Sequence, residues 1–247
     1  MVVLVLLFIV TTLGSLLSGL TGLAGGAVIL GGLMMFFPTA ESLAMHGVVQ
    51  SVSNCTRVLF WWKSVHWDVV WRYTLFLIPG AFIGGLLFNH LNLHLVEASL
   101  GALILAVVWL PMPAPFGGTF TKNGFIWLGL LSGFFSMLAG VVGPLLNPFF
   151  DKLDIKRDQM VSTKSACQLI LHLARIGSYA GVVGLDLQKY GVEMVLMVIA
   201  AVLGIYLSRP MGRHITDRQL DTILKVLLTS IGTKNVASGL VGYFGSL

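Results

Sequence analysis

The chain has 247 residues, of which 56% are hydrophobic and only 10% are charged, and its net charge is +5. Soluble proteins carry about 25% charged residues, so this composition excludes a water-soluble fold. The positive charge does not require nucleic acid as a partner, because Lys and Arg collect in the cytoplasmic loops of membrane proteins. We expect an all-α, polytopic membrane protein surrounded by the lipid bilayer.

Apolar runs bounded by Gly, Pro or charge predict ten hydrophobic segments along the chain. They cover about residues 1–20, 23–37, 43–62, 70–90, 94–112, 124–138, 140–150, 159–183, 190–209 and 220–244. The segments 23–37 and 140–150 are too short to cross a ~30 Å hydrocarbon core comfortably at ~1.5 Å per residue. Gly, Pro and Asn interrupt the sequence around both. We expect each to form part of a broken or re-entrant helical hairpin, buried in protein or lining a cavity.

The loop charges predict the orientation of the chain. If each short segment reverses the chain direction, nine Lys and Arg residues fall on the side opposite the N-terminus and only Lys189 falls on the N-terminal side. Without these reversals, six of the same ten basic residues fall on one side of the membrane and four on the other. The positive-inside rule therefore favours ten segments, with both termini outside the cytoplasm. The nine are Lys63, Arg72, Lys122, Lys152, Lys156, Arg157, Arg209, Arg213 and Arg218, in loops expected at 63–72, 111–123, 151–158 and 209–221.

Five segments per half would place two similar halves of one membrane domain in opposite orientations. The first repeat is expected at 1–112 and the second at 113–247, and SGLTGLAGG at 18–26 resembles SGFFSMLAG at 132–140. A constant offset of 118 residues also maps four polar positions of the third segment onto the eighth segment. Inverted repeats with broken helices describe a secondary transporter. The four pairs are His46 with Lys164, Gln50 with Gln168, Asn54 with His172, and Arg57 with Arg175.

Each polar set has a spacing of four, four and three residues, which places it on one face of a helix. Cationic side chains inside a bilayer usually face a water-filled cavity or a partner. The carboxylates fall at or near segment ends, so we expect a small anion to neutralise the cations in mid-membrane. Alternatively, the stripes only hydrogen-bond the helices together, with Arg57 and Lys164 reaching towards the cytoplasmic interface. The carboxylates in question are Glu41, Asp68, Glu97 and Glu193.

The substrate site is expected between the midpoints of the two polar helices, near residues 52 and 171. Neutral donors there would replace the hydration of a permeating anion without holding it too tightly. The arginines would approach this site from the two sides of the membrane, and His46 and Lys164, nearer the helix ends, are secondary candidates. His172→Ala or Gln168→Ala is therefore expected to reduce transport more than His46→Ala. The central donors are Gln50, Asn54, Gln168 and His172, and the arginines are Arg57 on the cytoplasmic side and Arg175 on the periplasmic side.

Glycines at the two breaks are expected to bring backbone N–H groups close to the anion at the start of a return helix. The alternative for these glycines is close packing of helices in lipid. The residues concerned are Gly25, Gly26, Gly140 and Gly143.

These Gly-rich breaks and the polar helix after each of them resemble the sulfite exporter TauE/SafE family of bacterial inner-membrane permeases, over essentially the whole chain. The resemblance implies a multi-pass transporter of sulfite, a sulfonate or another small organic or inorganic anion, working as an exporter. Its glycine-rich motif falls on Gly22, Gly25 and Gly26, and on Gly140, Gly143 and Pro144. The sequence departs from the family pattern at Ala24 and Ala27, and at Val141 and Val142 where glycines are usual.

Two other function classes stay open. An intramembrane hydrolase could pair Ser18 or Ser136 with His172, although no G-x-S-x-G motif accompanies them. A metal or haem protein could use His46, His66, His90, His94 or His172; His90 and His94 have a suitable spacing of four, although they lie in the Asn-rich loop NHLNLH. We expect no enzyme activity, metal or cofactor, and a small anion and lipid as partners. Whether the chain forms a homo-oligomer, and which ion drives transport, stay open.

Overall fold

The computed structural model describes residues 1–21, 25–110, 121–139, 146, 149–150, 152–153, 155–211 and 217–246. Throughout these residues the regular structure is helical, which confirms the predicted all-α class. Three described helices are long and apolar enough to cross a membrane, Val2–Leu20, Trp67–Phe88 and Gln188–Ser208, and two shorter ones are also apolar, Leu93–Ala106 and Gly124–Leu138.

The helices follow the predicted segments closely. The first half contains α1 (Val2–Thr21), α2 (Gly25–Leu33), α3 (Thr39–Phe60), α4 (Trp67–Phe88) and α5 (Leu93–Trp109). The second half contains α6 (Gly124–Ala139), α8 (Arg157–Gly181), α9 (Gly191–Met211) and α10 (Asp217–Gly245). The short helix η1 (Trp62–Ser64) lies between α3 and α4, and η2 (Gln188–Tyr190) lies between α8 and α9. The predicted segment 140–150 lies almost wholly outside the described residues.

The third helix begins four residues before the predicted segment. Thr39 and Glu41 form its first turn, where the apolar run has not yet started. A carboxylate near a helix N-terminus is favourable because it faces the positive end of the helix dipole. Apolar runs therefore place the centre of this helix correctly but miss its polar first turn.

The short helix α2 packs against α1 as an antiparallel hairpin. A Cβ atom at Gly25 would overlap the backbone carbonyl oxygen of Gly14, and further along α2 Gly32 lies against Val10. Every residue of α2 is buried. In the first half α1 and α2 are thus two packed antiparallel helices, and glycine is required at Gly25 because the two backbones touch.

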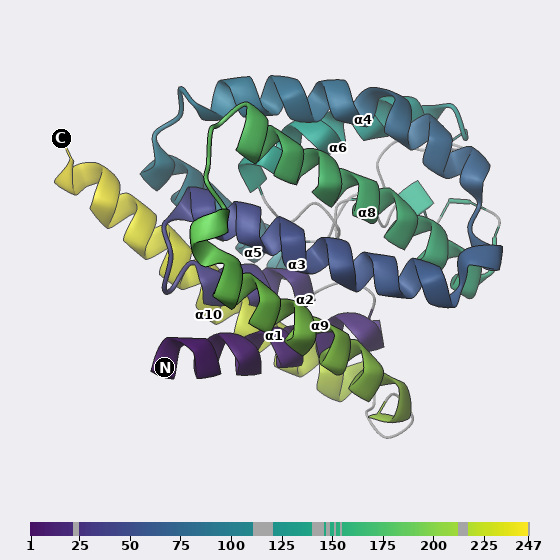
Figure 1. Cartoon of the computed structure of the whole chain (residues 1–247), viewed down its shortest axis with the longest axis horizontal. Coiled ribbons are helices and arrows are strands. Elements are labelled where there is room, and N and C mark those ends of the chain that lie inside the picture. Colours follow the sequence, from purple (N-terminus) through teal and green to yellow (C-terminus); the bar gives the residue numbers. More distant parts are fainter. Residues whose placement is uncertain are drawn as a thin grey trace.

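The remaining helices form two kinds of pairs around the centre of the molecule (Figure 1). Parallel pairs join one half to the other: α4 runs along α6, with Tyr73 beside Gly129 and Leu77 beside Gly133. In the same way α9 runs along α1, where a Cβ atom at Gly204 would meet the backbone of Thr12.

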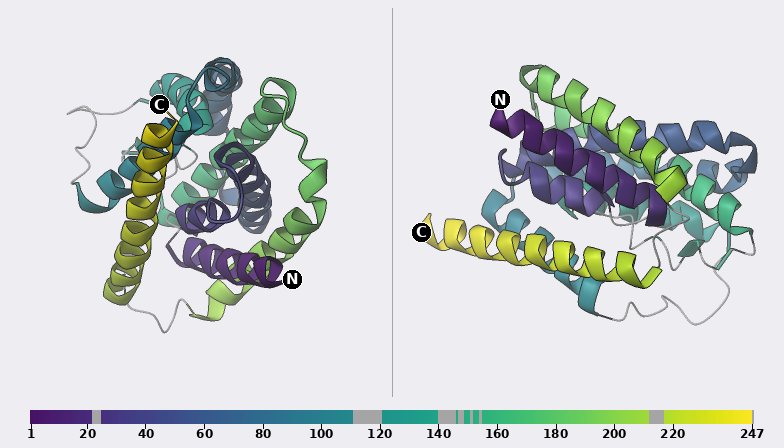
Figure 2. Two further views of the ribbon diagram at one scale, coloured as in Figure 1. Left: turned by 90° about the vertical axis from the view of Figure 1, so that its left-hand side faces the viewer. Right: turned by 90° about the horizontal axis from the view of Figure 1, so that it is seen from below.

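Two antiparallel pairs cross between the halves. In the first pair, α3 packs on α8, with His46 beside Arg175 at one end and His66 beside Thr163 at the other. In the second pair, α5 packs on α10. Both chain termini lie at the same end of the molecule, the left-hand end in Figure 1 and in the right panel of Figure 2.

Candidate functional site

The polar side chains of α3 and α8 face inward at the contact between these two helices. Of the eight predicted residues, seven are buried and only Gln168 is half-buried. Arg175 is fully enclosed, with 0% of its surface exposed. Burial of charge on this scale is costly unless a partner or ligand compensates it. The seven are His46, Gln50, Asn54, Arg57, Lys164, His172 and Arg175.

A direct contact joins the two halves at His46 and Arg175. The Nη2 atom of Arg175 lies 2.8 Å from Nδ1 of His46. The ring of His172 stands edge-on to the ring of His46, with 5.7 Å between the ring centroids. Gly47, next to His46, has no side chain, and a Cβ atom there would lie 3.4 Å from the guanidinium of Arg175. The secondary candidate His46 therefore lies inside the same cluster as His172 and Arg175.

Arg57 is held by hydroxyl groups. Its Nη2 atom donates to Ser18 Oγ at 2.5 Å and to Ser53 Oγ at 3.1 Å. Within the described residues it forms no ion pair with a carboxylate. The two serine contacts fix its orientation but leave its positive charge uncompensated.

Several buried polar atoms in this cluster have no hydrogen-bond partner among the described residues. Leaving such an atom unsatisfied costs about 1–3 kcal/mol, so a concentration of them in one place indicates room for a ligand or water. Asn54 shows the pattern: its amide nitrogen donates to the Gln50 backbone carbonyl at 2.9 Å, while its side-chain oxygen has no partner. The atoms are His46 Nε2, Gln50 Oε1, Asn54 Oδ1, Arg57 Nε and His172 Nδ1.

The N-terminus of α2 faces the same cluster. A Cβ atom at Gly26 would overlap the side-chain amide of Gln50 and lie 3.3 Å from His46 Nε2. Backbone N–H groups at a helix start carry partial positive charge and favour anions. Gly25 and Gly26 thus begin α2, with Gly26 beside the polar side chains of α3. The other predicted glycines, Gly140 and Gly143, and the motif residues Gly22 and Pro144, lie outside the described residues.

The charges around this cluster are arranged largely as the sequence predicts. Glu41, Asp68 and Glu193 each lie in the first turn of a helix. Glu97 lies slightly further inside α5 and forms a 3.2 Å ion pair with Lys234. This ion pair was not predicted from the sequence, although the lysine at 234 stands within the last apolar segment.

The two serine partners of Arg57, Ser18 and Ser53, were not predicted from the sequence either. Ser53 is four residues before Arg57 on the same helix, so the spacing alone could have identified it. Ser18 is 39 residues away in sequence and only the packing of the helices brings it close.

Comparison with known protein families gives one match. The family model described as sulfite exporter TauE/SafE matches residues 7–235, nearly the whole chain. The chain belongs to the TauE/SafE family. It is therefore a membrane transporter, and the family's description names sulfite as cargo. No curated protein and no solved structure matches the chain.

In this TauE/SafE family member the hydroxyl groups considered for a hydrolase have other partners. Ser18 accepts from Arg57, and Ser136 donates to the Gly133 carbonyl at 2.8 Å. Neither of these hydrogen bonds involves His172. Among the described residues no group of three or more His, Cys, Asp or Glu side chains is placed to hold a metal ion.

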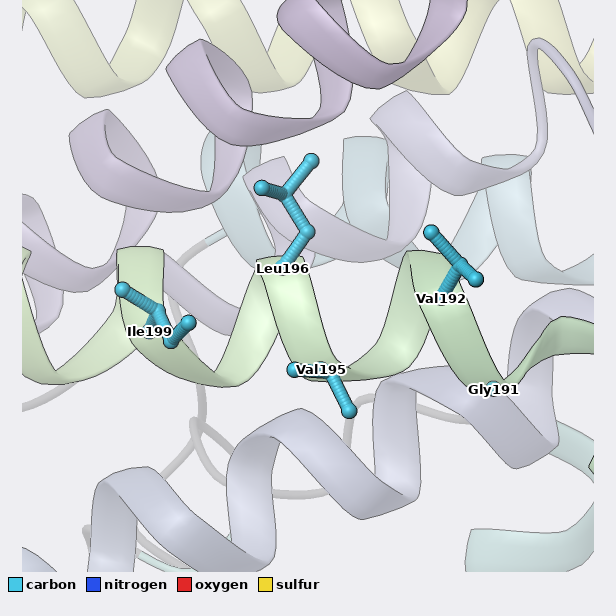
Figure 3. A pocket seen from close by; sticks show the side chains of 5 residues that line it. All are labelled: Gly191, Val192, Val195, Leu196 and Ile199. Carbon is cyan, nitrogen blue, oxygen red and sulfur yellow. The ribbon is translucent and has the colours of Figure 1, made fainter.

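Two hollows on the described surface are apolar and separate from the polar cluster. The first lies along α9, and Figure 3 shows its lining side chains projecting from that single helix. The second lies between α4 and α8. Both face outward where lipid would cover them, so neither is a candidate for the anion. The first is lined by Gly191, Val192, Val195, Leu196 and Ile199, and the second by Ile78, Phe82, Ile170, Leu173, Ala174, Gly177, Ser178 and Val182.

Proposed function

We propose that this TauE/SafE family member exports a small sulfur-containing anion, sulfite or a sulfonate, across the bacterial inner membrane, and that the anion binds between α3 and α8. The observation that carries the proposal is the group of five buried polar atoms without partners on His46, Gln50, Asn54, Arg57 and His172. Two buried arginines on the same helix pair supply positive charge. An oxyanion accepts from Arg57 Nε and from imidazole N–H groups, whereas the side-chain oxygens of Gln50 and Asn54 are acceptors and bind a protonated oxygen of the substrate.

The donor set favours an oxyanion over a halide or a cation. Arg57 and Arg175 donate only, and the α2 start at Gly26 adds backbone donors. The unpartnered side-chain oxygens of Gln50 and Asn54 are acceptors, so a protonated oxygen of the substrate also finds a partner. A cation would meet the guanidinium groups at close range and be repelled.

We propose further that the two halves are inverted repeats. Three features of the packing support this: α4 on α6 has a counterpart in α9 on α1, and α3 with α8 and α5 with α10 are antiparallel pairs between equivalent helices. Gly80 and Gly204 make equivalent backbone contacts, against Leu130 and Thr12 respectively. Two repeats of opposite orientation allow the central site to open alternately to either side.

The binding test uses purified protein in detergent with sulfite, thiosulfate, methanesulfonate, taurine and acetate. A bound anion stabilises the folded state by mass action, so we expect an oxyanion of sulfur to raise the melting temperature. Acetate and sodium chloride at equal ionic strength serve as controls. If every anion gives the same small shift as chloride, the anion site is not where we place it.

Direction and topology need two further measurements. Right-side-out vesicles loaded with radiolabelled sulfite should show net efflux, and inverted vesicles should accumulate sulfite from the medium, because both movements correspond to export from the cell. For topology, Cys55 and Cys167 are first replaced by Ala, and single cysteines are introduced at Ser64 and Asp186. An impermeant thiol reagent added to intact cells should label position 186 and leave position 64 unlabelled. Labelling at position 64 from outside would overturn the proposed orientation.

A further inference from the structure

We propose that His46 is a proton-binding site that is coupled to anion binding, so that one proton is taken up at its Nδ1 atom when the anion binds at Arg175. This inference rests on the proposed anion site and names the coupling ion for it. The starting observation is the 2.8 Å contact between Arg175 Nη2 and His46 Nδ1, at the point where the two halves meet.

The contact defines the protonation state of the ring. A guanidinium group has only donors, so His46 Nδ1 must be the acceptor and carries no proton. The single ring proton is then on Nε2, which has no hydrogen-bond partner among the described residues and lies near Gly26. In this structure His46 is therefore neutral and accepts a hydrogen bond from Arg175 Nη2.

A second proton on His46 is incompatible with this contact. Protonated Nδ1 would become a donor facing another donor, and two positive charges would lie about 3 Å apart in a buried site, which is strongly repulsive. An anion between the two groups removes the conflict because it accepts from Arg175 Nη2 and from His46 Nδ1 at once. Anion binding therefore favours protonation, and by thermodynamic linkage protonation favours anion binding to the same extent.

The charges that face His46 from the adjoining helices are cationic or neutral. From α8, Arg175 and His172 face it directly. Lys164 lies further along α8, next to Thr163, which contacts His66 at the opposite end of the helix pair. From α2, which contains no titratable residue, the backbone of Gly26 faces it.

Two of the carboxylates on α3 or on an element packed against it are engaged by other residues. Glu97 of α5 bonds Lys234 and Ser238, and Glu41 of α3 pairs with Lys189. Glu193 lies in the first turn of α9. Among the described residues no ion pair joins His46 to a carboxylate, so an incoming anion can supply the negative charge that stabilises a protonated His46.

The pair related to this one by the repeat contains no histidine. The constant offset places Lys164 opposite His46 and Arg57 opposite Arg175, so each pair takes one residue from each half. Arg57 donates to two serine hydroxyls, which do not titrate in the working pH range. Proton coupling is therefore expected from the pair of His46 and Arg175, which makes the two repeat-related pairs functionally unequal.

The test is calorimetric titration of the purified full-length protein with thiosulfate and with methanesulfonate, which stay ionised over the working pH range. Each titration is made in two amine buffers of different ionisation enthalpy, Tris and Bis-Tris, which carry no competing sulfonate. For the wild type we expect uptake of up to one proton per anion. Above the pH at which His46 titrates in the free protein, the affinity should fall by about tenfold per pH unit.

His46→Gln is the decisive variant, because the glutamine oxygen still accepts from Arg175 but cannot take a proton. It should bind the anion with weaker and pH-independent affinity and without proton uptake. His90→Gln, at an exposed turn, is the matched control and should behave as the wild type. His172→Gln should retain proton uptake even though its affinity is lowered.

Three results would overturn the inference. Wild-type binding without proton uptake would exclude coupling while leaving the anion site intact. Proton uptake that survives in His46→Gln but is lost in His172→Gln would assign the proton to His172. If neither anion binds the wild type, while the thermal-shift panel also shows no binding, the proposed function fails and this inference fails with it.

Discussion

Two antiparallel helix pairs join the halves of this molecule, and they differ in whether their polar groups have hydrogen-bond partners. In the pair of α5 and α10, polar groups satisfy one another: Glu97 accepts from Ser238 at 2.7 Å and pairs with Lys234, while Trp109 donates to Thr229 at 2.9 Å. In the pair of α3 and α8, by contrast, four side chains of α3 each have a buried polar atom with no hydrogen-bond partner among the described residues.

The difference distinguishes a structural interface from a binding site. Groups that bond one another stabilise the fold and leave nothing for a ligand, whereas unsatisfied buried groups cost stability and persist where function requires them. One atom departs from this contrast, since Asn235 Oδ1 on α10 also has no described partner. Its amide nitrogen contacts Met34 at 3.5 Å, at the end of α2, so even this residue is partly engaged.

The largest effect is expected when the charge of the α3–α8 pair is reduced. Arg57→Gln and Arg175→Gln each remove one guanidinium from the anion, and a hydrogen bond to a charged group contributes about 1.5–3 kcal/mol. We expect the affinity for the anion to fall at least tenfold in either variant, since about 1.4 kcal/mol corresponds to tenfold. Dissociation constants measured by calorimetry at matched folding give the test.

The matched control for these variants is Lys189→Gln. It also removes one positive charge, from an exposed ion pair with Glu41 at the end of α3. We expect its anion affinity to stay within about twofold of the wild type, because exposed charges are screened. Wild-type affinity in both arginine variants would reassign the arginines to packing.

Substitutions at the two adjacent glycines at the start of α2 are expected to have different effects, one on folding and the other on transport. A Cβ atom at Gly25 would overlap the Gly14 backbone, which cannot yield, so Gly25→Ala should lower the melting temperature strongly. A Cβ atom at Gly26 would meet side chains alone, the tip of the flexible Gln50 and, at 3.3 Å, His46 Nε2, so Gly26→Ala should fold normally and transport several-fold more slowly. Gly177→Ala, where a Cβ atom meets nothing within 4 Å, is the control. Equal melting temperatures for the Gly25 and Gly26 variants would contradict this picture of the hairpin.

The histidines and Gln168 allow a finer comparison within the site. The sequence ranks His46 below His172 and Gln168 because it lies further from the middle of its helix. In the structure His46 contacts Arg175 directly, and Gln168 is only half-buried. We therefore expect His172→Ala and His46→Ala to reduce sulfite flux about equally, and Gln168→Ala to reduce it least. Flux in proteoliposomes at matched protein content would decide between the two rankings.

Local patterns were sufficient to predict the described helices and the polar side chains that share one face of α3. Spacings of three and four residues put His46, Gln50, Asn54 and Arg57 on one helical face, and this face is buried as expected. The 118-residue offset between the halves was less informative about how buried two matched residues are. Trp61, which matches Tyr179 by the same offset, ends α3 with 42% of its surface exposed.

Contacts between distant segments could not be predicted from such patterns. The hydroxyl of Tyr179 donates to the Met137 carbonyl of α6 at 2.7 Å, and Ser18 of α1 accepts from Arg57 of α3. Each depends on how separate helices cross, and spacing within one segment contains no information about that. The same limit explains why the ion pair of Lys234 with Glu97, 137 residues apart, was missed.

The smallest effect on transport is expected from Lys234, and it sharpens the contrast between the two helix pairs. The ammonium group donates to the Met34 carbonyl at 3.0 Å, just beyond the C-terminus of α2, and to Glu97. A cation at a helix C-terminus stabilises the helix through its dipole. Because the side chain is 41% exposed, replacing it should cost only about 1 kcal/mol of unfolding free energy.

Lys234→Met should therefore lower the melting temperature by about 2–4 °C while leaving anion affinity within about twofold of the wild type. Glu97→Gln should behave similarly, because it breaks the same ion pair but keeps an acceptor for Ser238. A tenfold loss of affinity in Lys234→Met without a change in melting temperature would show that the α5–α10 pair acts on the anion. In that case satisfied and unsatisfied polar groups would not mark the boundary between structure and site in this fold.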